Sequence, residues 1–376
     1  MDEVDVLIIG AGVIGLAIAE RLAGPFREVV VVEKHDGFGR ETSSRNSEVI
    51  HCGMYYADDL LKTRLCVAGN PLLYELCARE GIPHRKTGKI VVATDETESE
   101  NLHQVFTQGR KNGVSGLSLI DSKQIAAREP DVRGILGLLS RESGIVDSHQ
   151  LMEYFARTAI SRGATLACNG EVTGITKGGD GYSIEVREAD GTRTGLKAEC
   201  VVNSAGLHAD RVAAMAGIDT AEAGYEIRPC KGEYFRVSAR HRGRLQTLVY
   251  PVPSPVHLGA HAVLGLDGSL KIGPSSFYVD ALEYGVDPAH QAEFHRKAVR
   301  FLPFLDLDDL SPDMSGIRPK LYRRGEPFRD FIIREESDRG LPGLVNLVGM
   351  ESPGLTSCLT IAEKVKNLLT GGSSTS

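Results

Sequence analysis

The first thirty-three residues alternate between buried-strand, turn and helix patterns. Residues 4–9 (VDVLII) are mostly apolar and rich in β-branched side chains, which is typical of a strand buried on both faces of a parallel sheet. A glycine-containing segment follows, and residues 16–23 then place apolar positions at helical spacing. Residues 29–32 (VVVV) form a second apolar run that ends at Glu33. The pattern predicts a complete β-α-β unit.

The remainder of the chain continues to mix the two periods. Helical spacing predicts helices at residues 59–80, 97–109, 122–129, 147–163, 207–216, 289–301 and 355–369. Short β-branched runs predict strands at residues 86–94, 134–139, 182–188, 194–199, 200–204 and 344–348. Residues 225–278 are rich in strand-like segments of alternating pattern and contain repeated Pro and Gly. This fits a second, mostly antiparallel sheet. At about 100–200 residues per domain, 376 residues predict two domains or three.

Composition narrows the class of protein. Hydrophobic residues make up 41% and charged residues 25%, as in a soluble globular protein. The net charge of −7 disfavours a nucleic-acid partner, because such proteins carry a basic domain. The basic stretch at residues 236–244 (RVSARHRGR) is interpreted as a solvated loop.

Cysteine use and hydropathy suggest a cytoplasmic protein. The seven cysteines form no CxxC pair, so we expect free thiols and no metal site. No apolar run approaches the roughly 18 residues that a membrane-spanning helix needs. Residues 4–23 are preceded by Asp2 and Glu3 rather than by basic residues, which argues against a signal peptide.

The strongest motif is a GxGxxG sequence formed by Gly10, Gly12 and Gly15. It directly follows the first predicted strand and opens a helix, and Glu33 ends the next strand 18 residues after Gly15. This is the context of a dinucleotide site: the glycines allow a tight turn, close approach to a pyrophosphate and helix–strand packing, and the acidic residue accepts hydrogen bonds from a ribose.

Residues 41–47 (ETSSRNS) favour FAD over NAD. They place hydroxyl, amide and guanidinium donors shortly after Glu33, where the second phosphate and the ribityl chain of FAD need partners. The same residues could also cap a helix, and the two interpretations are compatible.

The motifs together resemble those of a known flavoprotein superfamily. The motifs follow one another from about Val4 to Leu369. In chain order they are GAGVIGLAIA, Glu33, ETSSRNSEVIHCGMYY, VVNSAGLHAD, KGEYF, VYPVP, LGAHA, GIRPK, DFII and VGMESPGLTSCLTIAE. In this order they resemble the D-amino-acid-oxidase superfamily, and within it the L-2-hydroxyglutarate dehydrogenases and oxidases. The dinucleotide motif marks only the superfamily, whereas NSEVIHCGMYY, KGEYF, YPVP and ESPGLT are more specific.

The resemblance implies an α/β fold with a discontinuous, Rossmann-like domain that binds FAD noncovalently. We expect this domain at residues 1–84, 145–224 and 325–370. Residues 85–144 and 225–324 would form an α+β substrate domain on a mixed, mostly antiparallel sheet, and residues 371–376 a disordered tail. Implied cofactor-binding residues are Gly10, Gly12, Val13, Ile14, Gly15, Glu33, Lys34, Thr42, Ser43, Ser44, Asn46, Val172, Ala205, Gly206, Gly349, Ser352, Pro353, Gly354, Leu355 and Thr356.

Two histidines are candidate bases for oxidation of an alcohol. His51 precedes CGMYY, and His261 lies in the GAH segment of the second predicted sheet. An imidazole titrates in the range that removal of a hydroxyl proton requires. The alternative for His51, a core histidine bonded to backbone, remains open.

A 2-hydroxydicarboxylate also requires cationic or phenolic anchors. The candidates are Tyr55, Arg228, Lys231, Tyr234, Tyr250 and Arg318. Arg318 is the strongest, because its segment connects the second domain to the closing flavin segment. Ala262 and residues 316–320 (GIRPK) depart from the family pattern in this presumed substrate region.

The expected function is oxidation of a small 2-hydroxy acid to a 2-oxo acid by hydride transfer to flavin N5, with L-2-hydroxyglutarate as the favoured substrate. The alternatives are an amine or amino-acid oxidase of the glycine or D-amino-acid type, a glycerol-3-phosphate dehydrogenase and, least favoured, a flavin-binding protein without catalysis. The electron acceptor stays open among oxygen, a quinone and a soluble carrier. A quinone acceptor is compatible with peripheral membrane contact.

Overall fold

The chain folds into two compact units, each with its own hydrophobic core. The computed structural model describes residues 2–24, 28–253 and 261–371; residues 372–376 of the predicted tail lie outside this range. Unit 1 comprises Met1–Ser44, Ser148–Pro229 and Arg318–Ser376, and unit 2 comprises Arg45–Asp147 and Cys230–Ile317.

The boundaries between the units differ from the sequence expectation chiefly at residues 45–84. These residues belong to unit 2 because they pair and bond within it. Strand β3 (Val49–Ile50) is antiparallel to β8 (Gly144–Val146), and the Asn70 side chain donates to the carbonyls of His51 at 2.8 Å and Glu142 at 2.9 Å. The long polar segment after the first β-α-β unit therefore changes unit at Arg45.

Unit 1 is built on one sheet with eight strands among its described residues. They are β1 (Asp2–Ile9), β2 (Val29–Val32), β9 (Thr165–Ala167), β10 (Gly170–Gly178), β11 (Gly181–Glu188), β12 (Arg193–Asn203), β19 (Ile332–Glu336) and β20 (Leu341–Val348). The central strand β1 runs parallel to β2 on one side and to β12 on the other. Leu7 and Ile8 are fully buried, as the apolar run predicts for a strand covered on both faces.

Strand β12 merges two strands that the sequence pattern separates. Its first half pairs antiparallel with β11, and its last residues pair parallel with β20. The first half is mostly exposed and the last four residues are buried. The change in burial along one strand explains why the pattern divides it near Cys200.

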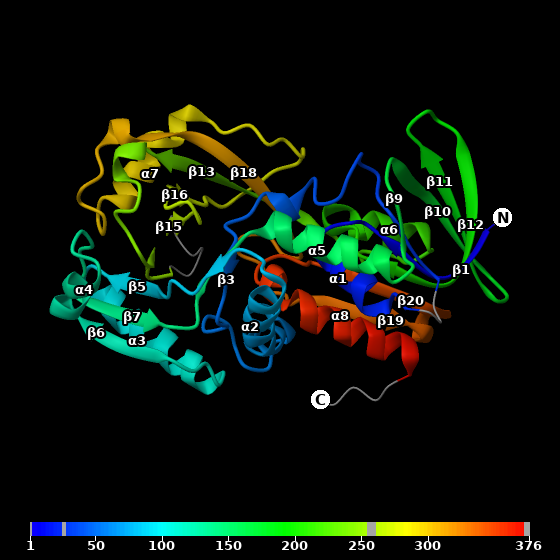
Figure 1. Cartoon of the computed structure of the whole chain (residues 1–376), viewed down its shortest axis with the longest axis horizontal. Coiled ribbons are helices and arrows are strands. Elements are labelled where there is room, and N and C mark those ends of the chain that lie inside the picture. Colours follow the sequence, from blue (N-terminus) through cyan, green and yellow to red (C-terminus); the bar gives the residue numbers. More distant parts are fainter. Residues whose placement is uncertain (1, 25–27, 254–260, 372–376) are drawn as a thin grey trace. The chain divides into compact units, whose positions relative to one another are not determined.

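Four helices accompany this sheet in the described part of unit 1: α1 (Val13–Leu22), α5 (Ser148–Ser161), α6 (Ala209–Met215) and α8 (Gly354–Thr370). Helix α1 packs against both α5 and α8 (Figure 1). The parallel strands with covering helices confirm the predicted Rossmann-like arrangement.

Unit 2 contains a larger mixed sheet. Its described strands are β5 (Lys89–Ala93), β6 (Leu117–Asp121), β7 (Leu136–Ser140), β13 (Arg228–Val237), β14 (Leu248–Pro251), β15 (His261–Leu264), β16 (Leu270–Gly273), β17 (Phe277–Tyr278) and β18 (Leu310–Lys320). The first two residues of β13 and the last three of β18 are assigned to unit 1. Strands β14 and β5 run parallel. Strand β5 is antiparallel to β7, and the β14–β15, β15–β16 and β13–β16 pairs are antiparallel too. The predicted mixed, mostly antiparallel sheet is confirmed.

A small sheet and four helices complete the described part of unit 2. The small sheet joins β3, β8 and β4 (His84–Arg85). The helices are α2 (Leu61–Glu80), α3 (Glu96–Lys111), α4 (Ser122–Arg128) and α7 (Gln291–Ala298). None of the helices in the described residues combines the length and apolar character needed to cross a bilayer.

A buried polar network ties the strands of unit 1 together around Glu336. The fully buried Glu336 carboxylate accepts hydrogen bonds from Tyr225 Oη at 2.5 Å and Asn346 Nδ2 at 2.9 Å. Arg339 supplies the charge that compensates it, 2.5 Å from Oε2. Asn346 Oδ1 in turn accepts from Asn203 Nδ2 at 2.7 Å. The network thus connects the ends of β19, β20 and β12.

Replacement of Glu336 tests this network. Glu336→Ala leaves Tyr225, Asn346 and Arg339 without their shared acceptor, so we expect a loss of about 3 kcal/mol in the free energy of unfolding. Urea denaturation followed by circular dichroism measures it. The control is Asp338→Asn, which removes a more exposed ion pair with Arg334 and should change stability by less than about 1 kcal/mol. Equal effects of the two changes would contradict the assignment.

Candidate dinucleotide and substrate sites

The turn between β1 and α1 is shaped by two close backbone approaches. Gly10 has a φ of +99°, which disfavours other residues, and a β-carbon there would lie 2.8 Å from the carbonyl oxygen of Ser204. A β-carbon on Gly15 would lie 2.1 Å from the carbonyl oxygen of Gly10 and 2.6 Å from Ser204 Oγ. These two positions therefore need glycine for the fold itself.

Gly12 differs from its two neighbours in the motif. A β-carbon at Gly12 would meet only Ser43 Oγ, at 3.0 Å, among the described atoms. Ser43 Oγ also accepts a hydrogen bond from Val13 N at 3.0 Å. The N-cap of helix α1 is Gly12, which has no side chain to accept from the helix, and the first turn contains no acidic residue that would compete with a bound anion. A side chain at Gly12 would press only on the end of the Ser43 side chain, so the fold restricts this position less than Gly10 or Gly15, whereas a phosphate held at the helix N-terminus would require glycine.

Glu33 closes the dinucleotide-binding loop from the end of β2. It is 8% exposed, and its carboxylate accepts from the backbone N–H groups of Ala11 at 2.8 Å and His35 at 2.9 Å. A carboxylate has about four lone-pair sites, so acceptor capacity remains for ribose hydroxyls. The glycine cradle and this carboxylate fit the ADP half of a dinucleotide.

Lys34 is engaged by two residues that the sequence analysis did not select. Its Nζ lies 2.7 Å from Glu41 Oε1 and 2.7 Å from His208 Nε2. Burial alone would raise the pKa of the Glu41 carboxyl, but hydrogen bonds from His208 and Lys34 outweigh it and hold this pKa well below its usual range. Lys34 therefore already has an anionic partner, and a cofactor-binding role for it stays a prediction.

The remaining predicted donors of this loop lie just after Glu41. Thr42, Ser43 and Ser44 form one 3-10 turn, and Ser44 Oγ donates to the carbonyl of Glu41 at 3.2 Å. Asn46 belongs to unit 2, where its Oδ1 accepts from Glu48 N at 2.7 Å. Ser44 thus bonds within its own turn, and Asn46 is not in the unit that carries the glycine motif.

Three further predicted residues lie in unit 1 beside the motif or Glu33. Ala205 and Gly206 follow Ser204, whose Oγ donates to the carbonyls of Ile9 at 2.9 Å and Gly10 at 3.1 Å. Val172 is buried in β10, the strand that begins where Gly170 N donates to the carbonyl of Glu33 at 2.9 Å. Their common location is the carboxyl-terminal edge of the parallel strands.

The β20–α8 turn provides a second helix N-terminus in unit 1. Gly349 ends the strand with a φ of +76°, Ser352 and Pro353 form the turn, and Gly354 begins α8. A β-carbon on Gly354 would lie 3.4 Å from Ile14 Cδ1, so the first turns of α8 and α1 are neighbours. Leu355 and the fully buried Thr356 complete the first turn of α8. This end of α8 has the positive dipole that suits an anionic reduced flavin.

In unit 2, several predicted substrate residues surround a lysine that the sequence analysis missed. Lys89 is level with Leu248, and Val91 is level with Tyr250, so Lys89 and Tyr250 share one face of the sheet. Lys89 Nζ lies 4.1 Å from the ring centre of Tyr250 and 5.5 Å from that of Tyr55. His261 stacks on Tyr250 with ring centres 3.8 Å apart and planes inclined by 6°.

His51 is held at the end of β3 in the same unit. Its carbonyl accepts from Asn70 Nδ2 at 2.8 Å. Burial, and secondarily the positive charge of Lys89, lower the pKa of His51 well below 6.5. The imidazole is therefore neutral near pH 7 and can accept a proton.

The tyrosines of this region are donors at neutral pH. Burial raises the pKa of Tyr55 and of Tyr250 well above the usual value, and the neighbouring Tyr234 adds to the shift of Tyr250. Tyr234 Oη lies 2.7 Å from Ser47 Oγ. Phenols with raised pKa values stay protonated and can donate to an anion.

Of the predicted carboxylate anchors, Lys231 lies on the opposite face of this sheet, and Arg228 and Arg318 belong to unit 1. Lys231 lies three residues from Tyr234 on β13, hence on the opposite face, where its Nζ donates to the carbonyl of Gly285 and lies 3.6 Å from Glu233 Oε1. It lines a hollow of about 380 Å³ there. Arg228 belongs to unit 1 and pairs with Glu226 at 2.8 Å. Arg318 is half-buried near the end of β18, also in unit 1.

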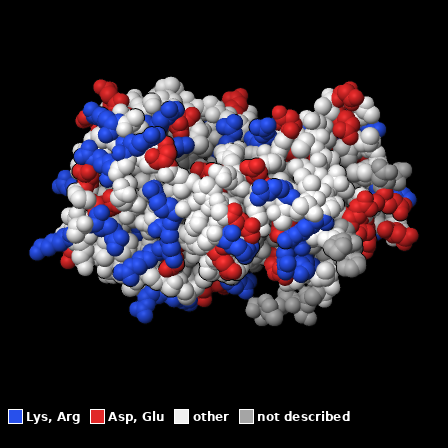
Figure 2. Space-filling model, viewed as in Figure 1, with Lys and Arg blue, Asp and Glu red and all other residues white. Residues whose placement is uncertain are grey.

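Charged residues elsewhere are largely compensated locally. In the basic stretch, Arg236, Arg240, Arg242 and Arg244 each pair with an aspartate. The stretch is only partly the predicted solvated loop, because it begins at the end of β13 and buries Val237 and His241. The face drawn in Figure 2 intersperses basic and acidic groups (Figure 2). The seven cysteines are free, as expected.

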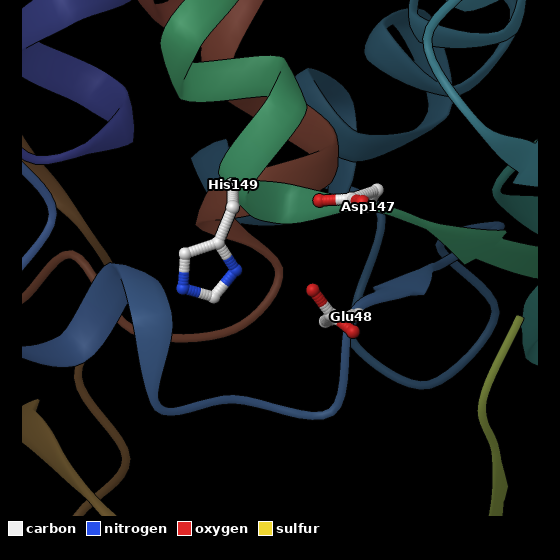
Figure 3. A group of neighbouring side chains, drawn as sticks. All are labelled: Glu48, Asp147 and His149. Atoms are coloured by element: carbon white, nitrogen blue, oxygen red, sulfur yellow. The ribbon is translucent and has the colours of Figure 1, made fainter. Parts of the chain in front are cut away.

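Figure 3 draws Glu48, Asp147 and His149, the last two flanking the point in the sequence where the chain passes from unit 2 to unit 1. Glu48 and Asp147, both in unit 2, present carboxylates from neighbouring segments, and His149 lies on the first turn of α5 in unit 1 (Figure 3). Glu48 has a φ of +54°, and its carbonyl accepts from Val146 N at 3.0 Å. His149 therefore marks the start of a helix, as the sequence predicts.

Residues 5–368 match the FAD-dependent oxidoreductase family (DAO), and the chain belongs to it. The protein is therefore an oxidoreductase whose cofactor is FAD, which agrees with the glycine cradle and Glu33 in unit 1. The mitochondrial L-2-hydroxyglutarate dehydrogenase of Arabidopsis thaliana is 36% identical over 97% of this chain and 83% of the relative.

Solved structures support the same fold. L-α-glycerophosphate oxidase from Mycoplasma pneumoniae, a structure with FAD bound, has a TM-score of 0.87 and 27% identity, covering 98% of this chain and 95% of that one. Glycine oxidase from Geobacillus kaustophilus has a TM-score of 0.83 and 24% identity, covering 100% and 96%. At that identity, the likeness to glycine oxidase concerns the fold.

The glycines of the motif allow binding and folding to be separated. Gly12→Ala should leave the fold intact yet weaken FAD binding at least about tenfold, because the added methyl group stands where the phosphate approaches. Gly15→Ala should instead destabilise the apoprotein through its clash with Gly10. Fluorescence titration with FAD and thermal unfolding of the apoprotein measure the two effects. Gly24→Ala, which meets no described atom within 4 Å, is the control; FAD binding by Gly12→Ala equal to that of Gly24→Ala would contradict the phosphate role.

Proposed function

We propose that this protein oxidises L-2-hydroxyglutarate to 2-oxoglutarate. Support comes from the Arabidopsis relative, whose name states that activity and which aligns over nearly the whole chain. Relatives from Bos taurus and Escherichia coli at 30% and 29% identity bear the same activity in their names.

The observation that carries the proposal is the alignment with a named L-2-hydroxyglutarate dehydrogenase over 97% of this chain, and His51 in unit 2 offers a base that fits it. Oxidation of a secondary alcohol requires removal of the hydroxyl proton while hydride leaves the same carbon, so the base must be deprotonated before the reaction. Burial and the charge of Lys89 keep His51 in that state. We assign His51 as the base and keep His261, stacked on Tyr250, as the rival.

The other roles follow from the chemistry of the side chains. FAD, when bound, supplies the two-electron acceptor that takes the hydride from C2 of the substrate. The glycine turn and Glu33 would hold its pyrophosphate and ribose. The first turns of α1 and α8 would stabilise negative charge. Tyr55, Tyr234 and Tyr250 would donate to the substrate, and Arg318 would bind a carboxylate through its guanidinium fork.

A second candidate is oxidation of glycerol 3-phosphate. The M. pneumoniae structure, whose title names a glycerophosphate oxidase, favours it with its TM-score of 0.87. The two substrates share a secondary hydroxyl and an anionic group, so the base would be the same. They differ in the geometry and charge of the anion.

Anaerobic mixing of the holoprotein with L-2-hydroxyglutarate tests the proposal through the flavin absorbance. We expect bleaching by this substrate and not by D-2-hydroxyglutarate, glycerol 3-phosphate, glycine or D-amino acids. Bleaching by glycerol 3-phosphate alone would establish the second candidate. Reoxidation of the bleached protein by oxygen, by a short-chain quinone or by a soluble dye then identifies the class of electron acceptor.

Replacement of the base should slow the chemical step. His51→Gln preserves hydrogen-bonding capacity but cannot take the proton, so we expect the rate of flavin reduction to fall about 10²- to 10⁴-fold. Stopped-flow absorbance measures the rate at saturating substrate. His103→Gln, an exposed position on α3, is the control. A large loss in His261→Gln with little in His51→Gln would transfer the role to His261.

The pH profile offers an independent check on the base. Because the pKa of His51 is lowered, the base stays deprotonated as the pH falls past neutrality. On the acidic side, kcat/KM should therefore keep more than half of its plateau value down to pH 6.5 and fall to half only below it. Substrate deuterated at C2 verifies that the profile reports the chemical step. A midpoint of the acidic limb above pH 6.5 would be incompatible with this environment of His51.

A further inference from the structure

Lys89 is a fully buried cation that is not paired within the described structure. It begins β5 with 0% exposure, and Nζ has no hydrogen-bond partner among the described residues. Nζ lies 4.1 Å from the ring centre of Tyr250 and 5.5 Å from that of Tyr55. Aromatic rings stabilise a cation only modestly and do not replace an anion.

The charge of Lys89 also finds little compensation nearby. Burial lowers the pKa of Lys89 to about 8, against the opposing effect of the thiols of Cys52 and Cys66. Burial raises the pKa of the Cys66 thiol, which is therefore uncharged near pH 7. No carboxylate of the described residues lies within 4.0 Å of Nζ. An ammonium ion kept in such surroundings is costly unless an anion joins it.

Among the described residues, a second donor without a partner, the hydroxyl of Tyr55, belongs to the ring whose centre lies 5.5 Å from Lys89 Nζ. Tyr55 Oη is buried and has no hydrogen-bond partner among the described residues. Burial raises the pKa of Tyr55, so the phenol keeps its proton. An ammonium group and a phenolic O–H together offer what one carboxylate group accepts.

We propose that Lys89 Nζ and Tyr55 Oη bind a carboxylate of the substrate. The proposal rests on the proposed function and adds a cation that the sequence analysis did not select. Among the predicted anchors, Lys231 and Arg228 already pair with Glu233 and Glu226, whereas Lys89 has an uncompensated charge. Tyr250 beside Lys89, His261 stacked on Tyr250, and His51, on which the charge of Lys89 acts, are other predicted residues of the site.

Ligand binding to the holoprotein tests the proposal without turnover. Glutarate, a dicarboxylate that lacks the reacting hydroxyl, should raise the melting temperature of the wild type more than valerate does. In Lys89→Met, which replaces the ammonium by an apolar side chain of similar length, this difference should vanish. The variant without ligand should melt at the wild-type temperature or above, because it removes a buried charge.

Kinetics provide the second readout. Lys89→Met should lower kcat/KM for L-2-hydroxyglutarate about 10- to 100-fold and Tyr55→Phe about 3- to 10-fold. The matched control is Lys271→Met, which removes a partly exposed lysine of the same unit paired with Asp313 at 3.0 Å; it should leave kcat/KM unchanged.

The outcomes separate this inference from the proposed function. Loss of melting temperature in ligand-free Lys89→Met, with glutarate binding intact, would show a structural lysine and overturn the assignment. If glycerol 3-phosphate but not glutarate raises the melting temperature of the wild type, the site binds a phosphate and the proposed carboxylate assignment is overturned. If glutarate binding depends on Lys89 but L-2-hydroxyglutarate does not bleach the flavin, the carboxylate site stands and the proposed reaction fails.

Discussion

The close approach of Gly15 to the carbonyl of Gly10 is the constraint on which the cofactor end of unit 1 depends. A β-carbon would stand 2.1 Å from that oxygen, so helix α1 can lie directly against the end of β1 only without a side chain there. Ser204 donates to the same carbonyl, which fixes β12 to the turn. Helix α1 in turn packs on α5 and α8. The N-termini of α1 and α8, which are proposed to face the cofactor, therefore depend for their positions on the contact between Gly15 and the Gly10 carbonyl.

In unit 2, burial lowers the pKa values of both the candidate base His51 and the candidate anchor Lys89. Burial lowers the pKa of His51 well below neutrality and that of Lys89 to about 8. Because their usual values differ, the same direction of shift leaves the imidazole neutral and the ammonium charged near pH 7. The lysine charge further favours the neutral imidazole. A base and a cation can therefore coexist in one interior, which a hydroxy-acid anion requires.

The fold could be predicted from the sequence more fully than the substrate residues. The apolar runs and the glycine spacing are local signals, and the structure confirms the parallel strands they predict. Lys89 could not be found in that way, because a lysine at the start of a predicted strand resembles a solvent-exposed residue. Its burial arises from β5 pairing with β14, which lies about 160 positions further along the chain. Lys231 looked equally suitable in sequence, yet its strand face places it beside Glu233.

The charge of Lys89 also bears on which substrates the family fold accepts in this chain. An amino acid brings an ammonium group to the reacting carbon, and like charges in a low-dielectric interior repel strongly. A hydroxy acid presents a neutral hydroxyl at that carbon and carries only anionic groups elsewhere. With a neutral base and an uncompensated cation in unit 2, the electrostatics favour alcohols that bear anions over amines. At 24% identity the likeness to glycine oxidase concerns the fold, and the choice of substrate depends on individual residues of the site.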